Sequence, residues 1–186
     1  MSAIDPRPPG AAKVRRITVM QGEALASGEA DVEFSTVLGS CVATCLYDPV
    51  ARIGGMNHFL LAEPPAHLAH LDFDEHYGMF LMELLINEML KLGAVKSRLK
   101  ARLYGGANMN TTLSAIGSAN AAFARQFLLQ EGIEKVFEDL EGHLARRVHL
   151  QPATGRVRCR ETAAVAVPKQ KPAARPQSDI GQVELF

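Results

Sequence analysis

Residues 33–47 read EFSTVLGSCVATCLY, and residues 52–61 read RIGGMNHFLL after an interruption that begins with Asp48-Pro49. Short apolar and β-branched runs bounded by Gly, Ser, Asp and Pro are typical of buried strands. Gly39-Ser40 divides the first run into strands over 33–38 and 42–47, and Asp48-Pro49 supplies turn chemistry before a return strand over 52–61. The stretch therefore predicts a β-rich centre with a hairpin in its middle.

The remaining elements extend this pattern in both directions along the chain. Further strands are expected over 15–20, 99–104, 133–139, 145–150 and 156–161, whereas the Gly-, Ala- and Glu-rich residues 21–31 are expected to form a connection. Residues 76–93 carry Met, Leu and Ile at helical spacing, and a second helix is expected over about 118–130. The predicted class is α+β, with mostly antiparallel pairing and two substantial helices.

Composition limits the functional classes. The 186-residue chain suits one domain, and its 20 basic and 20 acidic side chains cancel, which argues against a nucleic-acid partner. It shows neither a secretory signal at its start nor a run of eighteen apolar residues, so no membrane insertion is expected. The three cysteines, Cys41, Cys45 and Cys159, are expected to be reduced thiols in the cytoplasm.

The ends of the chain differ in composition from its middle. Residues 1–14 are rich in Pro, Gly and Ala, and residues 163–186 are rich in Ala, Pro, Gln and Lys. Both are predicted to be disordered, which leaves a domain over 15–162. The C-terminal tail ends in DIGQVELF, an acidic and hydrophobic sequence that suits a docking peptide as well as simple disorder.

The hairpin makes Cys41 and His58 a candidate nucleophile and base. If residues 48–51 form the turn, Tyr47 pairs with Arg52 and Cys41 directly faces His58. Their Cβ atoms would then lie about 4.5–5.5 Å apart, near enough for the imidazole to take the thiol proton. A slip of one residue would put them on opposite faces of the sheet. A bend at Gly39 would also free backbone N–H groups to stabilise an oxyanion.

A third residue is needed to orient the histidine, and Ser35 and Thr36 both offer a hydroxyl. Adjacent strand residues point to opposite faces, so only one of the two can serve. The alternative for Cys41 is a small apolar filler of a buried strand, which is the expected role of Cys45 and Cys159.

These residues resemble those of the CheD family of chemoreceptor glutamine deamidases. The resemblance covers roughly residues 17–161 and rests on TVLGSCVATCLYDP, IGGMNHFLL, ARLYGGANM, IGSANAAFARQFLLQEGI and DLEGHLARRVHLQPATGRV, in the family's order and spacing. It implies that Cys41 is the nucleophile and His58 the catalytic histidine. The family's third residue, a threonine six positions before the cysteine in some members, falls on Ser35; position favours Ser35, and Thr36 stays open.

The resemblance also implies a fold and an activity. The fold would be two packed, mostly antiparallel β-sheets with helices on the outside, similar to the catalytic domain of the cytotoxic necrotizing factor toxins. The expected activity is deamidation of glutamines of methyl-accepting chemotaxis receptors through a thioester, with no metal or organic cofactor.

Two other functions are alternatives. A mainly non-catalytic adaptor would bind chemoreceptors and a CheC-type phosphatase, with Val183–Phe186 as one candidate docking segment. A metal hydrolase could use the histidines and aspartates of HLAHLDFDEH at 67–76, although this stretch lacks the H-E-x-x-H arrangement and reads more simply as a polar loop before a helix.

Overall fold

The computed structural model describes residues 14–61, 75–108 and 114–162. In these ranges the strands are β1 (Arg15–Thr18), β2 (Glu23–Ser27), β3 (Val32–Leu38), β4 (Val42–Asp48), β5 (Ile53–His58), β6 (Lys100–Gly105), β7 (Glu134–Leu140), β8 (Ala145–Gln151) and β9 (Arg156–Thr162). The helices are α1 (Glu75–Lys91), the short 3-10 helix η2 (Lys96–Arg98) and α2 (Ser114–Gln130). The tail 163–186 and nearly all of 1–14 lie outside the described residues, so their predicted disorder stays a prediction.

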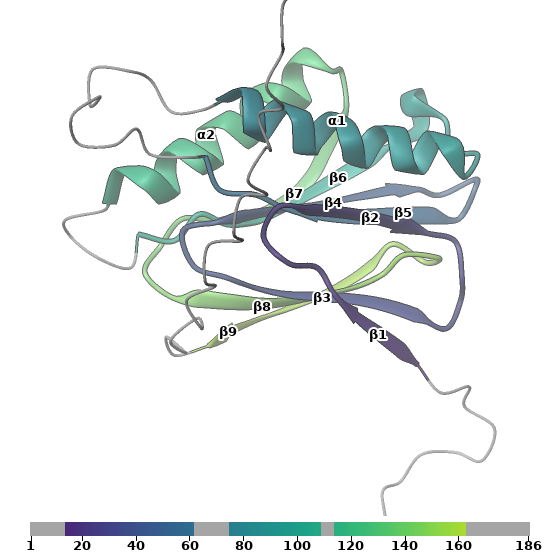
Figure 1. The fold of residues 1–186 in the computed structure, drawn as a ribbon, viewed down its shortest axis with the longest axis horizontal. Helices are drawn as coiled ribbons and strands as arrows, with labels where there is room; N and C mark the ends of the chain where they lie inside the picture. Colours follow the sequence, from purple (N-terminus) through teal and green to yellow (C-terminus); the bar gives the residue numbers. More distant parts are fainter. Residues whose placement is uncertain (1–13, 62–74, 109–113, 163–186) are drawn as a thin grey trace, which may run out of the picture.

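The strands form two sheets that pack face to face (Figure 1). One has the order β1-β3-β8-β9 and the other β2-β5-β4-β6-β7. Only β1–β3 and β6–β7 pair in parallel among the described strands; the other neighbours are antiparallel. The predicted α+β class and the two mostly antiparallel sheets are confirmed, whereas the likeness to the toxin domain stays a prediction.

The inner strands β4, β5 and β6 of the five-stranded sheet are largely buried on both faces. Both helices lie on its outer side (Figure 1), where α1 buries Leu81, Leu85 and Met89 against the sheet. A separate apolar cluster fills the space between the sheets. Gly54-Gly55 in β5 lets a neighbour pack closely on each face of the strand. A Cβ at Gly54 would lie 2.6 Å from the Pro152 carbonyl oxygen, and one at Gly55 would lie 2.6 Å from Leu85 Cδ1. The close approach of both neighbours explains this glycine pair.

The expectation of a connection over 21–31 was wrong in part. Residues Glu23–Ser27 form β2, the edge strand that pairs antiparallel with β5. The segment EALAS has low intrinsic strand propensity, so its conformation comes from pairing with β5 and from burial of Ala24 in the core.

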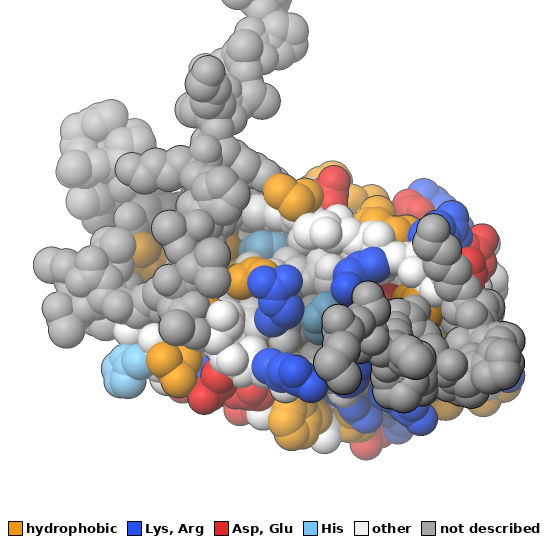
Figure 2. Space-filling model, turned by 90° about the horizontal axis from the view of Figure 1, so that it is seen from below, with side chains coloured by type: hydrophobic (Ala, Val, Ile, Leu, Met, Phe, Trp, Pro, Cys, Tyr) orange, Lys and Arg blue, Asp and Glu red, His pale blue; other side chains and the backbone are white. Residues whose placement is uncertain are grey.

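The outer face of the four-stranded sheet is strongly basic. Figure 2 looks onto this face, where Lys and Arg side chains gather. Glu33 of β3 is only 3% exposed there, and it accepts hydrogen bonds from Arg16 (2.8 Å) and Arg158. Burial alone would raise the pKa of Glu33, but the two guanidinium groups outweigh burial and lower it. The odd-numbered residues of β3 thus face outward, while Phe34 and Leu38 face the second sheet.

Candidate active site

Cys41 lies where the chain passes from one sheet to the other. It follows Gly39-Ser40, between the end of β3 in the four-stranded sheet and the start of β4 in the five-stranded sheet. Two carbonyl groups of this crossing are fixed by the segment after β6: Gly39 accepts from the Ala107 N–H (2.8 Å) and Cys41 accepts from the Gly106 N–H (2.7 Å). The nucleophile candidate is therefore held by a part of the chain more than sixty residues away.

Asn120 of α2 fixes the remaining carbonyl of the crossing. Its Nδ2 donates to the Ser40 carbonyl oxygen (2.8 Å), and its Oδ1 accepts from the Leu61 N–H (2.8 Å). The side chain is fully buried, and both ends of its amide are used. Asn120 thus ties the segment before Cys41 to the segment after β5.

The fixed carbonyls determine where the N–H groups of this crossing point. In a trans peptide the N–H points opposite to the C=O of the preceding residue. Since the Gly39 and Ser40 carbonyls point toward Ala107 and Asn120, the Ser40 and Cys41 N–H groups point away from them. Neither N–H donates to another residue of the described ranges. They are available to a ligand beside the thiol.

Gly105 makes this close approach sterically feasible. It has φ +105°, and a Cβ built on it would lie 2.2 Å from the Cys41 carbonyl oxygen. Any side chain here would push the crossing away from β6 and would also adopt a backbone conformation that L-residues rarely tolerate. The Gly105-Gly106 pair of the sequence therefore leaves room for the crossing that carries Cys41.

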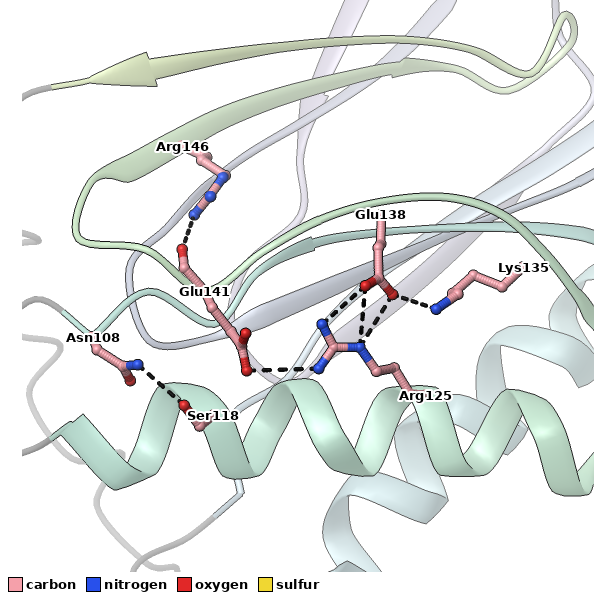
Figure 3. A network of polar contacts seen from close by, with 7 residues as sticks. All are labelled: Asn108, Ser118, Arg125, Lys135, Glu138, Glu141 and Arg146. Carbon is pink, nitrogen blue, oxygen red and sulfur yellow. Dashed lines mark hydrogen bonds and ion pairs between the residues drawn. The ribbon is translucent and has the colours of Figure 1, made fainter.

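A network of charged and polar side chains joins α2 to β7 and to the segments that follow β6 and β7 (Figure 3). Arg125 of α2 contacts Glu138 of β7 (2.9 Å) and Glu141 after β7 (3.6 Å). Nearer to the site, Asn108 Nδ2 donates to Ser118 Oγ (3.1 Å). These contacts hold α2, and Asn120 on it, against β7 and the segment after β6.

His58 at the end of β5 contacts Thr36 of β3, across the space between the sheets. The Thr36 hydroxyl donates to the Val19 carbonyl (2.9 Å), and its oxygen lies 2.8 Å from His58 Nδ1. A hydroxyl has one hydrogen. Since that hydrogen is given to Val19, Nδ1 of His58 must carry a proton and donate it to Thr36. In the neutral ring this leaves Nε2 as the unprotonated nitrogen, and Nε2 is buried without a partner among the described residues.

Burial keeps both reacting groups neutral. It raises the pKa of the Cys41 thiol to about 11, and the cysteine's own N–H offsets only part of that rise. Burial also lowers the pKa of His58, and the Val19 carbonyl and the charge of Glu23 offset this in part. At neutral pH the site therefore holds a thiol and a neutral imidazole, not a preformed thiolate–imidazolium pair.

The predicted register of the hairpin was wrong by two residues. Asp48 pairs with Ile53, and the β4–β5 pairing continues in that register to the bridge between Val42 and Phe59. Cys41 therefore does not directly face His58. A shift of two residues keeps every side chain on its original face, so the two are diagonal neighbours on the inner face of the sheet. Cys41 packs on the cluster between the sheets, which is also where His58 meets Thr36.

Asp48 causes the shift. Its Oδ1 accepts from the N–H groups of Val50 (2.9 Å) and Ala51 (3.1 Å), and its carbonyl accepts from the Arg52 N–H (2.9 Å). Arg52 adopts φ +57°, so the turn comprises residues 49–52 and not 48–51. A non-glycine residue in the left-handed region is uncommon, and no residue type in this turn indicates one.

The positional preference for Ser35 does not agree with the geometry. Ser35 pairs with His149 of β8 and shares the outward face of β3 with Glu33. The hydroxyl beside His58 belongs to Thr36, the alternative that the sequence left open. Counting six positions back from the cysteine assumes that a fixed number of residues separates it from the strand residue that contacts the histidine. With one residue fewer between them, the position falls on Thr36 and not on Ser35.

Three groups of this site were not singled out from the sequence. The Val19 carbonyl is one, since a backbone group leaves no sequence signal. Asn120 is the second; a buried Asn on an apolar helix face is the signal that could have identified it. The third is Gln21, whose Oε1 lies 3.7 Å from Cys41 Sγ and accepts from the thiol.

Comparison with known proteins identifies the family of the chain. The family model described as "CheD chemotactic sensory transduction" matches residues 60–161. A Zymomonas mobilis protein named "Probable chemoreceptor glutamine deamidase CheD" is 54% identical over 161 residues, which cover 87% of this chain and 85% of that protein. The chain belongs to the CheD family. A CheD relative of the same name from Rhizobium rhizogenes is 43% identical and covers 94% of this chain and 98% of its own.

Solved structures add little to the CheD assignment. A Neisseria meningitidis crystal structure of the DUF152 family model is 12% identical, covers 64% of this chain and 53% of that chain, and has a TM-score of 0.42. A structural similarity this low supports no conclusion about the fold or the function of this chain.

The metal alternative is not supported by the part of the chain that the structure describes. Those residues contain no group of three His, Cys, Asp or Glu side chains that could hold a metal ion. The candidate stretch 67–76 lies almost entirely outside them, so nothing in the structure tests it. Within the same ranges, no helix has the length and apolar character needed to cross a membrane.

Proposed function

We propose that this protein is a cysteine-dependent deamidase that converts glutamines of methyl-accepting chemotaxis receptors to glutamates. The observation that carries the proposal is the state of His58: its Nδ1–H is held by Thr36, and its unprotonated Nε2 is buried on the face of the sheet that also carries Cys41. That arrangement gives a general base for a neutral thiol. The names of the relatives supply the substrate class.

The first half of the reaction forms a thioester. The carboxamide of a receptor glutamine enters beside Cys41, and His58 Nε2 takes the thiol proton as the sulfur attacks the carbonyl carbon. The carbonyl oxygen becomes an oxyanion, which accepts hydrogen bonds from the Ser40 and Cys41 N–H groups. The imidazolium then gives its Nε2 proton to the amide nitrogen. The C–N bond breaks, ammonia leaves, and an S–C bond joins enzyme and receptor.

The second half releases glutamate. A water molecule takes the place of ammonia, and neutral His58 removes its proton as it attacks the thioester carbonyl. Collapse of the second tetrahedral intermediate breaks the S–C bond, and the proton returns to Cys41. The receptor gains one carboxylate per turnover, a local change of charge of the kind that shifts signalling equilibria.

Thr36 and Val19 serve His58 in both halves. Their oxygens lie on the Nδ1 side of the ring, 2.8 and 3.4 Å from Nδ1, and they favour the imidazolium that forms in each step. Because a hydroxyl and a carbonyl carry no full charge, they stabilise the imidazolium less than a carboxylate would. This is consistent with the lowered pKa of His58.

The partners and setting follow from the same proposal. A receptor substrate of this kind places the enzyme in the cytoplasm, and a CheC-type phosphatase remains an expected partner. The adaptor alternative would need neither the nucleophile nor its base. The Val183–Phe186 segment that would serve docking lies outside the described residues.

The proposal is tested by incubating the protein with the cytoplasmic fragment of a receptor from the same organism. Deamidation adds about 1 Da at each converted glutamine and releases one ammonia, both of which mass spectrometry and a coupled ammonia assay detect. The Cys41→Ala variant should give neither signal while unfolding at a similar temperature. An unchanged receptor, with the fragment shown to bind, would instead favour the adaptor.

A further inference from the structure

We infer that Gln21 is a built-in substrate mimic: its side-chain carboxamide occupies the subsite that the receptor glutamine must enter. The inference rests on the proposed function, since it names the group that fills the deamidase subsite in the free enzyme. Gln21 carries the functional group on which such an enzyme acts, and its carbonyl oxygen lies 3.7 Å from Cys41 Sγ. A substrate carboxamide must bring its carbonyl to the same sulfur.

The turn that presents Gln21 is anchored to the active site. Met20 to Glu23 form a β-turn in which the Glu23 N–H donates to the Met20 carbonyl (3.0 Å) and Gly22 takes φ +89°. A positive φ at the third position is the signature of a type II turn and explains the glycine. The Gly22 N–H donates to the His58 carbonyl (2.8 Å). The turn is thus bonded directly to the catalytic histidine's own backbone.

The same segment also supplies the oxygen that orients the base. The carbonyl of Val19, two residues before Gln21, accepts the hydrogen bond of the Thr36 hydroxyl. Residues 19–22 therefore touch the site three times: at Thr36, at Cys41 and at His58. These contacts fix the backbone on both sides of Gln21 next to Cys41, and from there its exposed side chain reaches the thiol.

The contact stabilises the resting enzyme. A thiol that donates to a carbonyl keeps its proton, and the carboxamide covers the sulfur on one side. An arriving glutamine offers the same acceptor, so it can replace Gln21 without leaving the thiol unpaired. Gln21 then competes within the enzyme with the receptor glutamine for the position beside Cys41. Only a ligand that brings a carboxamide and makes further contacts with the enzyme surface displaces it.

Alkylation of Cys41 tests this without a substrate. Gln21→Ala should react with iodoacetamide about fivefold faster than the wild type at pH 8, which corresponds to about 1 kcal/mol of lost protection. Gln21→Asn, which keeps the amide but retracts it by one methylene, should behave in the same way. Met20→Ala is the matched control: it alters an exposed side chain of the same turn and should leave the rate unchanged.

Receptor deamidation provides the second readout. Gln21→Ala should lower the KM for the receptor fragment about fivefold and leave kcat unchanged, because only competition in the free enzyme is removed. Wild-type alkylation rates in both Gln21 variants would overturn the inference. A fall of tenfold or more in kcat would also overturn it, since Gln21 would then act in the transition state. If the wild type leaves the receptor unchanged, the proposed function fails, while the alkylation rates still decide whether Gln21 covers Cys41.

Discussion

Thr36→Val is the perturbation that most sharply separates the two hydroxyl candidates. Thr36 is 3% exposed, and its oxygen makes two hydrogen bonds, to His58 Nδ1 (2.8 Å) and to the Val19 carbonyl (2.9 Å). Valine keeps the shape but removes both. Since Nδ1 also lies 3.4 Å from the Val19 carbonyl, part of the loss is recovered, and unfolding should become easier by about 1–3 kcal/mol.

The larger effect should be on turnover. Without the hydroxyl, Nδ1–H keeps only its long contact, and the ring is free to rotate or to change tautomer. We expect kcat to fall about 10- to 100-fold with KM unchanged, a part of the 10²–10⁴ that a positioned base contributes. The acidic limb of the pH–rate profile should also move, which a purely structural defect would not cause.

The assay is receptor deamidation followed by mass spectrometry, with stability measured by urea titration. Thr36→Ser keeps the hydroxyl and should recover most of the rate. Ser35→Ala is the matched control, because Ser35 lies on the outward face of β3 and should be dispensable. A positioning role for Thr36 is refuted if Thr36→Val retains kcat within twofold, or if Ser35→Ala loses as much activity as Thr36→Val.

Three further predictions concern the surroundings of the site. Gly105→Ala should lower kcat more than tenfold, because its Cβ would lie 2.2 Å from the Cys41 carbonyl oxygen. The control is Gly93→Ala, at φ +104° with no atom within 4 Å, which should cost only about 1 kcal/mol of stability. A fully active Gly105→Ala would contradict the prediction. The alkylation rate of Cys41 should rise nearly tenfold per pH unit from pH 7 to 10, since burial raises its pKa to about 11; a plateau below pH 9 would reveal a thiolate already formed. Arg98→Ala should cost about 3 kcal/mol near pH 7, because it leaves the buried Asp48 carboxylate without its ion pair. Burial raises the pKa of Asp48, but Arg98 and backbone N–H groups hold it well below its usual range, so this stability is present above about pH 4 and lost in acid; an equal cost at pH 3 in urea titrations would contradict the assignment.

The sequence predicted the elements whose side chains carry their own signal. The β-branched and apolar runs of β3, β4 and β5 form strands, as predicted, and most residues of these strands are buried. Cys41 and His58 lie on the same face of the sheet, as predicted, although the predicted register was wrong. A shift of two residues leaves each side chain on its original face.

What the sequence could not predict depends on contacts between distant segments. The strand β2 has a composition typical of a loop and owes its form to β5. The choice between Ser35 and Thr36 depends on how many residues the crossing to Cys41 uses, and the turn after Asp48 depends on a left-handed Arg52. Gln21 comes from a turn whose position is set by a hydrogen bond to the His58 carbonyl. None of these leaves a periodic pattern.

The proposed deamidation requires a covalent bond between Cys41 and the receptor glutamine. Its most direct test is intact-mass analysis of the enzyme quenched in acid during turnover of a glutamine-containing receptor peptide. The mechanism predicts an adduct whose mass is enzyme plus peptide less ammonia, about 17 Da, attached at Cys41 and removed by hydroxylamine. The adduct should be absent from Cys41→Ala. Deamidation that continues in Cys41→Ala, or an adduct at another residue, would contradict catalysis by the Cys41 thiol.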